Sequence, residues 1–117
     1  MMGENRMAKP LQEELSQFHA GICQALADTT RIAILYELAE GRNNVSQLVE
    51  ALDSPQATVS RHLKVLRERG MVNHERDGVH VYYSLADQRI IEALDLLRGV
   101  MADILAQRSR LAEALTR

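Results

Sequence analysis

The sequence predicts a mainly α-helical α+β fold, in which four helices, a β-hairpin and a long last helix follow one another as α-α-α-α-β-β-α. Apolar residues recur at helical spacing in five segments, and runs rich in β-forming residues flank Asp77-Gly78. With 117 residues, 46% of them hydrophobic and 26% charged, the chain has the composition of one soluble globular domain.

The first expected helix carries a narrow apolar stripe. Its members recur at alternating steps of four and three residues: Leu11, Leu15, Phe18, Ile22 and Leu26. This spacing is typical of a helix that packs on another helix, and we expect the stripe to contribute to a contact between two copies of the chain. Residues 1–10, which precede it, are expected to form a flexible segment.

Capping residues mark the next two helices. Asp28 or Thr29 can cap a second helix that runs to Glu40, where Gly41 closes it. The core face of this helix is expected to consist of Ile32, Leu35 and Leu38 or Ala39. A short third helix, about Ser46 to Leu52, contributes Leu48, Val49 and Leu52. A tight turn over Asp53-Ser54-Pro55 then leads into the fourth helix.

The fourth helix combines an apolar row with a polar face. Ser54 is expected to cap it, Pro55 suits its first position, and Gly70 ends it. The apolar row is Val59, Leu63 and Leu66, which directs the following side chains at solvent or a partner: Gln56, Thr58, Ser60, Arg61, Lys64 and Arg67. A short helix, a turn of few residues and a longer helix form a helix-turn-helix over residues 46–69.

The hairpin is predicted by Asp77-Gly78, a favoured two-residue turn. After it, Val79, Val81, Tyr83 and Leu85 alternate with His80, Tyr82 and Ser84. One face of the hairpin should therefore pack on the helices, because two strands alone are marginally stable. Arg76, His80 and the turn should project outward as a wing over residues 71–85, which makes the fold a winged helix-turn-helix.

The last helix is expected to run from Asp87 to about Leu115. Its apolar residues follow coiled-coil spacing: Ile90, Leu94, Leu97, Met101 and Ile104. A helix of roughly 40 Å reaches beyond a small helical domain. The apolar row should meet a copy of itself or the first helix, so a homodimer through the first and last helices is expected, although the row could instead belong to the core of one chain. Residues 11–106 form the expected domain, and 107–117 extend its last helix.

Charge is distributed unevenly along the chain. The net charge is −2, but residues 54–85 hold five basic and three acidic side chains, which leaves −4 for the remainder. A locally basic surface on an acidic body can neutralise phosphates, although charges of this kind also occur on any solvated helix. The polar helix and the hairpin therefore point to DNA.

Several other functional classes find no support in the sequence. One cysteine excludes a disulfide within the chain and any Cys-x-x-Cys pair. The chain has no long apolar run and no signal-peptide pattern, so we expect a cytoplasmic protein without membrane contact. It also contains no nucleophile elbow, phosphate-binding glycine loop or paired-carboxylate cleft, so we do not expect an enzyme.

Three motifs occur in order: Leu26-Ala27-Asp28-Thr29-Thr30-Arg31-Ile32, then Val59-Ser60-Arg61-His62-Leu63-Lys64-Val65-Leu66, and Asp77-Gly78 followed by Val81-Tyr82-Tyr83. Together they resemble the ArsR/SmtB family of bacterial winged-helix transcriptional regulators, over roughly Leu11 to Ile104. Thr29 departs from the proline usual in that family. The resemblance implies a homodimeric repressor that binds double-stranded operator DNA and releases it when a metal ion or another signal is sensed.

The two metal sites of that family are not found in this sequence. One uses a Cys-x-Cys pair at the start of the third helix, where this chain has no thiol between Asn44 and Leu48. The other uses Asp and His residues of the last helix, which here has carboxylates but no histidine. We therefore expect no cofactor. His19 and Cys23, one turn apart, are the remaining weak metal or thiol-sensing candidates; alternatively, Cys23 is a small buried side chain and His19 lies on the surface.

For DNA, we expect Gln56, Ser60 and Arg61 to reach base edges, while Thr58, Lys64 and Arg67 contact phosphates or adjacent bases. His62 and His80 belong to the family-like motifs and should face DNA or support the reading helix, and Arg76 should act from the wing. Thr30 and Arg31 begin the second helix, where free amides favour a phosphate. Two alternatives remain: a winged-helix module that binds protein, and a thiol- or metal-responsive sensor acting through Cys23.

Overall fold

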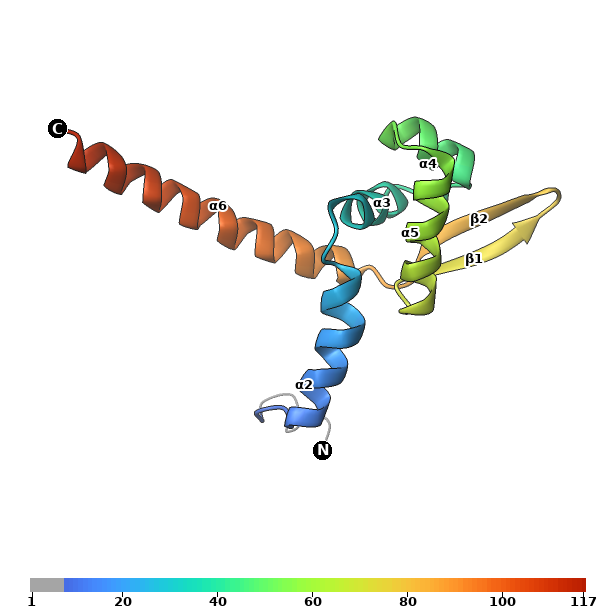
Figure 1. Ribbon diagram of the computed structural model, residues 1–117, viewed down its shortest axis with the longest axis horizontal. Helices are drawn as coiled ribbons and strands as arrows, with labels where there is room; N and C mark the ends of the chain where they lie inside the picture. Colours follow the sequence, from blue (N-terminus) through green and yellow to red (C-terminus); the bar gives the residue numbers. More distant parts are fainter. Residues whose placement is uncertain (1–7) are drawn as a thin grey trace. The chain divides into compact units, whose positions relative to one another are not determined.

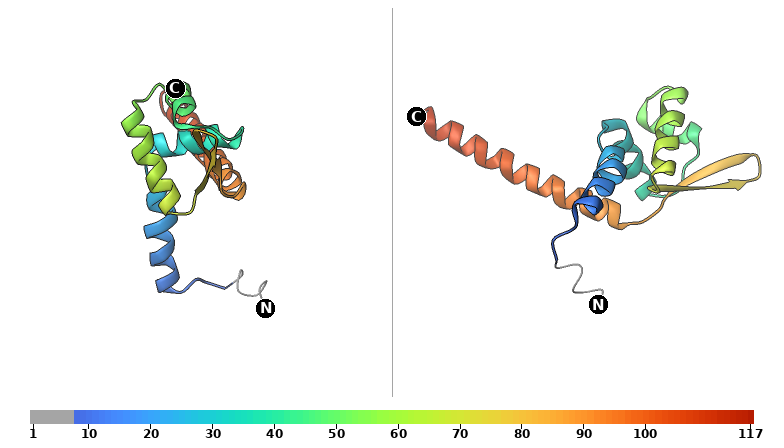
Figure 2. Two further views of the ribbon diagram at one scale, coloured as in Figure 1. Left: turned by 90° about the vertical axis from the view of Figure 1, so that its right-hand side faces the viewer. Right: turned by 60° about the horizontal axis from the view of Figure 1, so that its bottom comes forward.

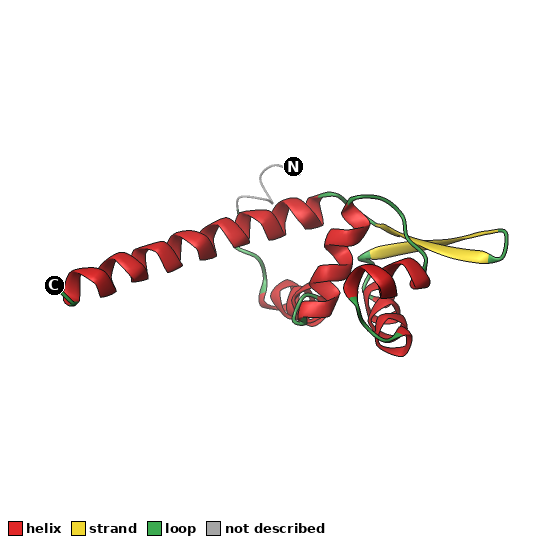
Figure 3. Cartoon of the chain, turned by 90° about the horizontal axis from the view of Figure 1, so that it is seen from above, coloured by secondary structure: helices red, strands yellow, loops and turns green. Residues whose placement is uncertain are grey.

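A computed structural model describes residues 8–117 (Figure 1). Its elements are, in order, α2 (Gln12–Phe18), the π-helical turn η1 (His19–Cys23), α3 (Thr29–Ala39), α4 (Val45–Leu52), α5 (Gln56–Glu68), β1 (Val72–Asp77), β2 (His80–Leu85) and α6 (Arg89–Leu115). The chain divides into two compact units between Ala86 and Asp87. The predicted order of helices and strands is confirmed (Figure 3). Most of the expected flexible segment, residues 1–7, lies outside the described residues.

The first helix is not the uninterrupted α-helix that the apolar stripe predicts. After Phe18 the chain widens into the π-helical turn η1 and regains α-helical geometry at Gln24. The Arg69 guanidinium, which follows α5, donates to the carbonyl oxygens of Ala20 and Gly21 inside this turn. An inserted side chain is a common cause of a break in the helical hydrogen-bond ladder. The π-helical turn therefore coincides with a contact from a residue 48 and 49 positions further along the chain.

Side chains cap α3 and α4. The Asp28 carboxylate accepts from the backbone amides of Thr30 and Arg31 at 2.8 and 3.2 Å, so of the two predicted caps, Asp28 and Thr29, Asp28 is the one that caps α3. Asn44 and Gln47 form a reciprocal capping box at the start of α4. Because Asn44 takes the cap position, α4 begins one residue before the expected Ser46.

The start of α5 differs from the prediction. Pro55 stands at the cap position with φ −59° and ψ 147°, and no side chain caps the helix. The hydroxyl of Ser54 instead donates to the Leu52 carbonyl oxygen at 3.4 Å, so the expected Ser54 cap is wrong. Asp53, with φ +50°, ends α4 in the left-handed conformation and makes the predicted turn. At the other end, Gly70 leaves α5 with φ +75°, as expected for a glycine exit.

The core lies beneath α5. The predicted row of Val59, Leu63 and Leu66 is at most 1% exposed, which confirms the apolar face of this helix. These side chains share the core with Ile34, Leu35, Leu38, Leu48, Met71 and Val72. On α3 the structure buries Ile34 in place of the expected Ile32, which is half-buried. Burying each such side chain contributes about 1.5–3 kcal/mol, so the core fixes the orientation of α5.

The hairpin turns one residue later than predicted. Asp77 pairs with His80 across the antiparallel strands, so the two-residue loop is Gly78-Val79. Gly78 has φ +67° and Val79 does not have a positive φ, as in a type II′ turn with glycine first. Val79 is consequently 87% exposed at the tip and does not join the packed face. Asn43, in the loop before α4, adds an isolated antiparallel bridge to Tyr83 beside this two-stranded sheet.

Helix α6 is one continuous helix of 27 residues and makes up most of the second compact unit. The Asp87 carboxylate accepts from the Arg89 backbone amide at 2.9 Å just before its first turn. Ile91 and Leu94 are its buried residues. The helix runs unbroken through residue 106, where the expected domain ends. No helix of the described residues is long and apolar enough to cross a membrane.

Candidate nucleic-acid interface

The polar face of α5 is open to solvent. This helix runs along an outer edge of the helical body (Figure 2, left). Thr58 is half-buried. The other side chains that were predicted to contact DNA from this helix are exposed: Gln56, Ser60, Arg61, Lys64 and Arg67. The apolar row on the opposite side is fully packed, so the exposed face is held against a rigid support.

Two cations of this face are available to an anion. Within residues 8–117, neither Arg61 nor Lys64 forms an ion pair with a carboxylate of the protein. Arg67 is different, because its Nη1 lies 3.4 Å from Nε2 of His74 on β1. An exposed Arg or Lys without an internal partner can approach a phosphate or a base edge without first breaking a contact.

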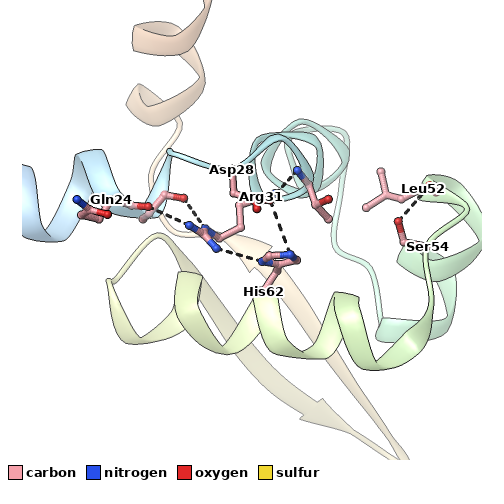
Figure 4. Close-up of polar contacts among 8 residues, drawn as sticks. Gln24, Asp28, Arg31, Leu52, Ser54 and His62 are labelled. Atoms are coloured by element: carbon pink, nitrogen blue, oxygen red, sulfur yellow. Dashed lines mark hydrogen bonds and ion pairs between the residues drawn. The ribbon is translucent and has the colours of Figure 1, made fainter.

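His62 lies beneath the helix and not on its exposed face. Its side chain is buried, and Arg31 Nη1 donates to its Nδ1 at 3.1 Å (Figure 4). A guanidinium only donates, so this geometry assigns the ring proton to Nε2, which lies 3.7 Å from the Asp28 carboxylate. Burial lowers the pKa of His62, and the charges of Arg31 and Arg61 lower it further, against the opposing effect of Asp28. Of its two predicted roles, facing DNA and supporting the reading helix, the buried position of His62 and its bond from Arg31 favour the second.

Arg31 also forms its hydrogen bonds within the protein. Its Nε donates to the Ala25 carbonyl oxygen at 2.7 Å, and its Nη2 donates to that of Gln24 at 3.0 Å (Figure 4). Together with the bond to His62, the guanidinium links the end of the first helix, the start of α3 and the underside of α5. Three of the five N–H donors of the Arg31 guanidinium are therefore used within the protein, and its phosphate contact stays a prediction.

The start of α3 already holds an anion of its own. The Asp28 carboxylate takes the amides of Thr30 and Arg31, so the predicted phosphate site formed by free amides is wrong. Burial acts to raise the pKa of Asp28. The pKa nevertheless lies below its ordinary value, because the carboxylate accepts hydrogen bonds from these two amides and lies near His62 and Arg31. The sequence did carry the signal, since an acidic residue at a cap position competes with any external anion.

Arg76 and His80 lie on opposite faces of the hairpin. His80 pairs directly with Asp77, whereas Arg76 pairs with Val81, and neighbouring pairs in a sheet alternate between faces. Both side chains are exposed, as predicted for a wing. The ring of His80 lies 6.1 Å from that of Tyr82 in an edge-on arrangement.

Arg42 is a basic residue near the wing that the sequence analysis did not select. It lies in the loop between α3 and α4, and its guanidinium covers the Tyr82 ring with Cζ 4.1 Å from the ring centroid. No periodic pattern in the sequence indicates a role for Arg42, because its partners on β1 and β2 lie far from it along the chain and come close only in the folded protein.

The residues predicted for dimerisation are largely exposed in this single chain. Leu11, Leu15 and Phe18 are 75%, 44% and 54% exposed, and Leu97, Met101 and Ile104 on α6 are 64%, 56% and 45% exposed. Ile22 and Ile90 are half-buried, while Leu94 is buried. Rows of exposed large apolar side chains are typical of surfaces that meet a partner.

The weak metal candidates gain no further ligands. Among residues 8–117, no group of three or more His, Cys, Asp and Glu side chains is placed to hold a metal ion. His19 is exposed and Cys23 is half-buried. These two residues lie in the π-helical turn η1, away from the caps described above.

Comparison with known proteins identifies the family. The sequence model of the protein family "Bacterial regulatory protein, arsR family" matches residues 28–74, from the cap of α3 into the first strand. The HTH-type transcriptional regulator NmtR of Mycobacterium tuberculosis is 39% identical over 93 residues, which cover 80% of this chain and 78% of NmtR. The chain belongs to the arsR family of bacterial regulatory proteins. The resemblance drawn from the three sequence motifs is thereby confirmed.

Other arsR-family comparisons agree in fold and class. The HTH-type transcriptional repressor SmtB of Mycobacterium tuberculosis is 42% identical over 81 residues, covering 69% of this chain and 60% of SmtB. The solution structure of the homodimeric winged helix-turn-helix DNA-binding domain Mb0332 of Mycobacterium bovis, a possible ArsR-family regulator, matches with a TM-score of 0.69 at 29% identity. That match covers 83% of this chain and 92% of the domain. This arsR-family chain is a winged helix-turn-helix, DNA-binding transcriptional regulator.

Proposed function

We propose that the protein is a repressor that binds a near-palindromic operator as a homodimer in the bacterial cytoplasm and leaves it in response to a signal. It acts by binding alone, with no catalysed reaction and no cofactor. The observation that carries this proposal is the open polar face of α5, whose Arg61 and Lys64 are exposed and unpaired within residues 8–117. The membership of the arsR family supports the same function.

Helix α5 enters the major groove in this proposal. Gln56, Ser60 and Arg61 lie on the exposed face and read base edges, while Lys64, Arg67 and Thr58 contact phosphates or adjacent bases. Arg76 and His80 act from the two faces of the wing. Thr30, Arg31 and His62 support the reading helix from behind, in line with their internal hydrogen bonds.

The exposed apolar rows support the homodimer. Leu97, Met101 and Ile104 on α6 leave a row of apolar surface uncovered, as do Leu11, Leu15 and Phe18. The related Mb0332 domain is homodimeric. We propose that residues 11–106 supply DNA binding and dimerisation and that 107–117 extend α6. Two-fold symmetry then places two copies of α5 about one helical turn of DNA apart, roughly 34 Å.

A binding titration tests the mode of recognition. Duplexes that bind the wild-type protein are first selected from a randomised pool, and their affinities are then measured by fluorescence anisotropy at several salt concentrations. We expect Arg61→Ala to lose about 1–3 kcal/mol of discrimination between the selected and altered sites. Lys64→Ala should weaken all duplexes alike and reduce the salt slope by about one.

Arg110→Ala is the matched control, because it removes the same charge from α6, outside the unit that carries α5. It should leave both the discrimination and the salt slope near the wild-type values. If Arg61→Ala and Lys64→Ala behave like this control, the assignment of α5 as the reading helix is wrong. A wild-type protein that prefers no duplex would favour the protein-binding module considered from the sequence.

The homodimer is tested by sedimentation equilibrium. Met101→Glu places a charge in the proposed apolar row and should shift the protein to the monomer, because burying an unpaired carboxylate is costly. Leu96→Glu is the control: Leu96 is 74% exposed on the same helix but lies outside the predicted row. A wild-type monomer, or equal effects of the two substitutions, would contradict the proposed interface.

A further inference from the structure

Arg42 connects the loop before α4 to both strands of the wing. Its Nη2 lies 2.9 Å from Oδ2 of Asp77, and its Nη1 lies 3.6 Å from Oε1 of Glu75. The same guanidinium stacks over the ring of Tyr82. One exposed side chain therefore contacts two carboxylates of β1 and an aromatic ring of β2.

The position of Arg42 is set by the backbone beside it. Asn43 donates to the Tyr83 carbonyl oxygen at 3.0 Å, and the Tyr83 amide donates back to Asn43 at 2.8 Å. This two-bond bridge fixes the loop along the outer side of β2. Arg42 precedes the bridge by one residue, so its side chain can reach only the adjoining part of the hairpin.

The partners of Arg42 share one face of the wing. Glu75 pairs with Tyr82 and Asp77 pairs with His80, and directly opposed residues two positions apart lie on the same face. This face of a DNA-binding wing therefore carries two carboxylates beside His80. Unpaired carboxylates there would repel phosphates, whereas a guanidinium held between them cancels much of their charge.

We propose that Arg42 is a positioning residue for DNA binding: it holds the hairpin against the loop before α4 and offsets one of the two negative charges of Glu75 and Asp77, without itself contacting DNA. The hairpin extends away from α3, α4 and α5 (Figure 1). The residues that Arg42 contacts, Glu75, Asp77 and Tyr82, lie towards the turn end of the paired strands. The proposal rests on the proposed function, since it concerns how the wing is presented to the duplex.

A double-mutant cycle separates positioning from direct contact. Affinity for the selected duplex is measured for four proteins: wild type, Arg42→Gln, the pair Glu75→Gln with Asp77→Asn, and all three changes together. Exposed ion pairs and a cation–π contact are individually modest, so we expect Arg42→Gln alone to weaken binding about five- to tenfold. In the neutral background, the same change should cost less than about twofold, because Arg42 no longer has charges to cancel.

Two further readouts complete the test. The salt slope should be unchanged by Arg42→Gln, and the urea midpoints of the four proteins should coincide. Equal affinity losses in the two backgrounds, with a salt slope lower by about one, would show that Arg42 contacts a phosphate and overturn the proposal. No loss in the wild-type background, or a loss matched by a lower urea midpoint, would overturn it as well.

The proposal can also be judged without DNA. Hydrogen exchange of the Tyr83 amide reports how firmly the loop holds the hairpin, and we expect faster exchange in Arg42→Gln than in wild type. If the wild-type protein prefers no duplex, the proposed function fails, and this exchange rate still decides whether Arg42 positions the wing. Unchanged exchange would refute the positioning role.

Discussion

Replacing Arg31 by methionine is expected to destabilise the protein strongly, although Arg31 lies at the start of a helix. The guanidinium donates to the carbonyl oxygens of Ala25 and Gln24 and to His62 Nδ1, at 2.7, 3.0 and 3.1 Å. Methionine keeps much of the apolar stem but removes all three donors. The two part-buried acceptors, on Ala25 and His62, would then lack a partner.

The size of the effect follows from these bonds. A hydrogen bond from a charged donor contributes about 1.5–3 kcal/mol, and a buried acceptor left unpaired costs about 1–3 kcal/mol. The Gln24 carbonyl is exposed, so water replaces Arg31 there at little cost. Counting only the bonds to Ala25 and His62, and allowing for partial exposure, we expect a loss of about 2–4 kcal/mol.

Urea unfolding followed by circular dichroism, at one fixed protein concentration, measures this loss. With a slope of about 2 kcal/mol per molar urea, in the middle of the usual range, the midpoint should fall by roughly 1–2 M. Arg31→Lys should recover only part of it, because one ammonium cannot span three acceptors. Arg76→Met, an exposed change on the wing, is the control, and a midpoint for Arg31→Met equal to that of this control would refute the reasoning.

Three further outcomes are expected. Leu63→Ala, in the 1%-exposed core beneath α5, should lower the free energy of unfolding by about 2–5 kcal/mol in the same urea assay; a loss below 1 kcal/mol would contradict the packing. Because the pKa of His62 is lowered by burial, its stabilising effect is complete above the ordinary value of 6.5 and is lost as pH falls through the folded value. Wild-type stability should therefore drop between pH 7 and 5 more steeply than that of His62→Gln, and parallel curves would argue against a neutral, buried His62. Gly78→Ala, at φ +67°, should cost roughly 1 kcal/mol by thermal unfolding, and an unchanged melting temperature would count against the assigned turn.

Patterns within a single element were predicted well from the sequence. The buried row of α5 follows from three apolar residues at helical spacing, and α6 follows from a long run of the same kind, because the helical period acts over neighbouring residues. Asp28 was one of the two residues predicted to cap α3 for the same reason, since its hydrogen bonds reach only two and three residues along the chain.

Contacts between distant segments were not predictable in this way. Arg31 meets His62 across 31 residues and Arg42 meets Asp77 across 35, and no local pattern indicates such pairs. The sequence could not show whether Arg31 and His62 meet DNA or other parts of the protein, because both types of side chain suit either an external phosphate or an internal partner. The hairpin turn was misplaced by one residue because Asp77-Gly78 and Gly78-Val79 both put the glycine in a permitted position.

The π-helical turn η1 changes what the apolar stripe of the first helix means. A turn of this kind adds one residue to the helical path and so rotates everything beyond it by about 100°. Leu15 and Phe18, before the turn, are exposed, whereas Ile22 and Leu26 are half-buried. The exposed members of the stripe therefore precede the turn, and the half-buried members lie in it or beyond it. Substitutions at Leu15 or Phe18 alter the outer surface of the molecule, while substitutions at Ile22 or Leu26 alter its own packing.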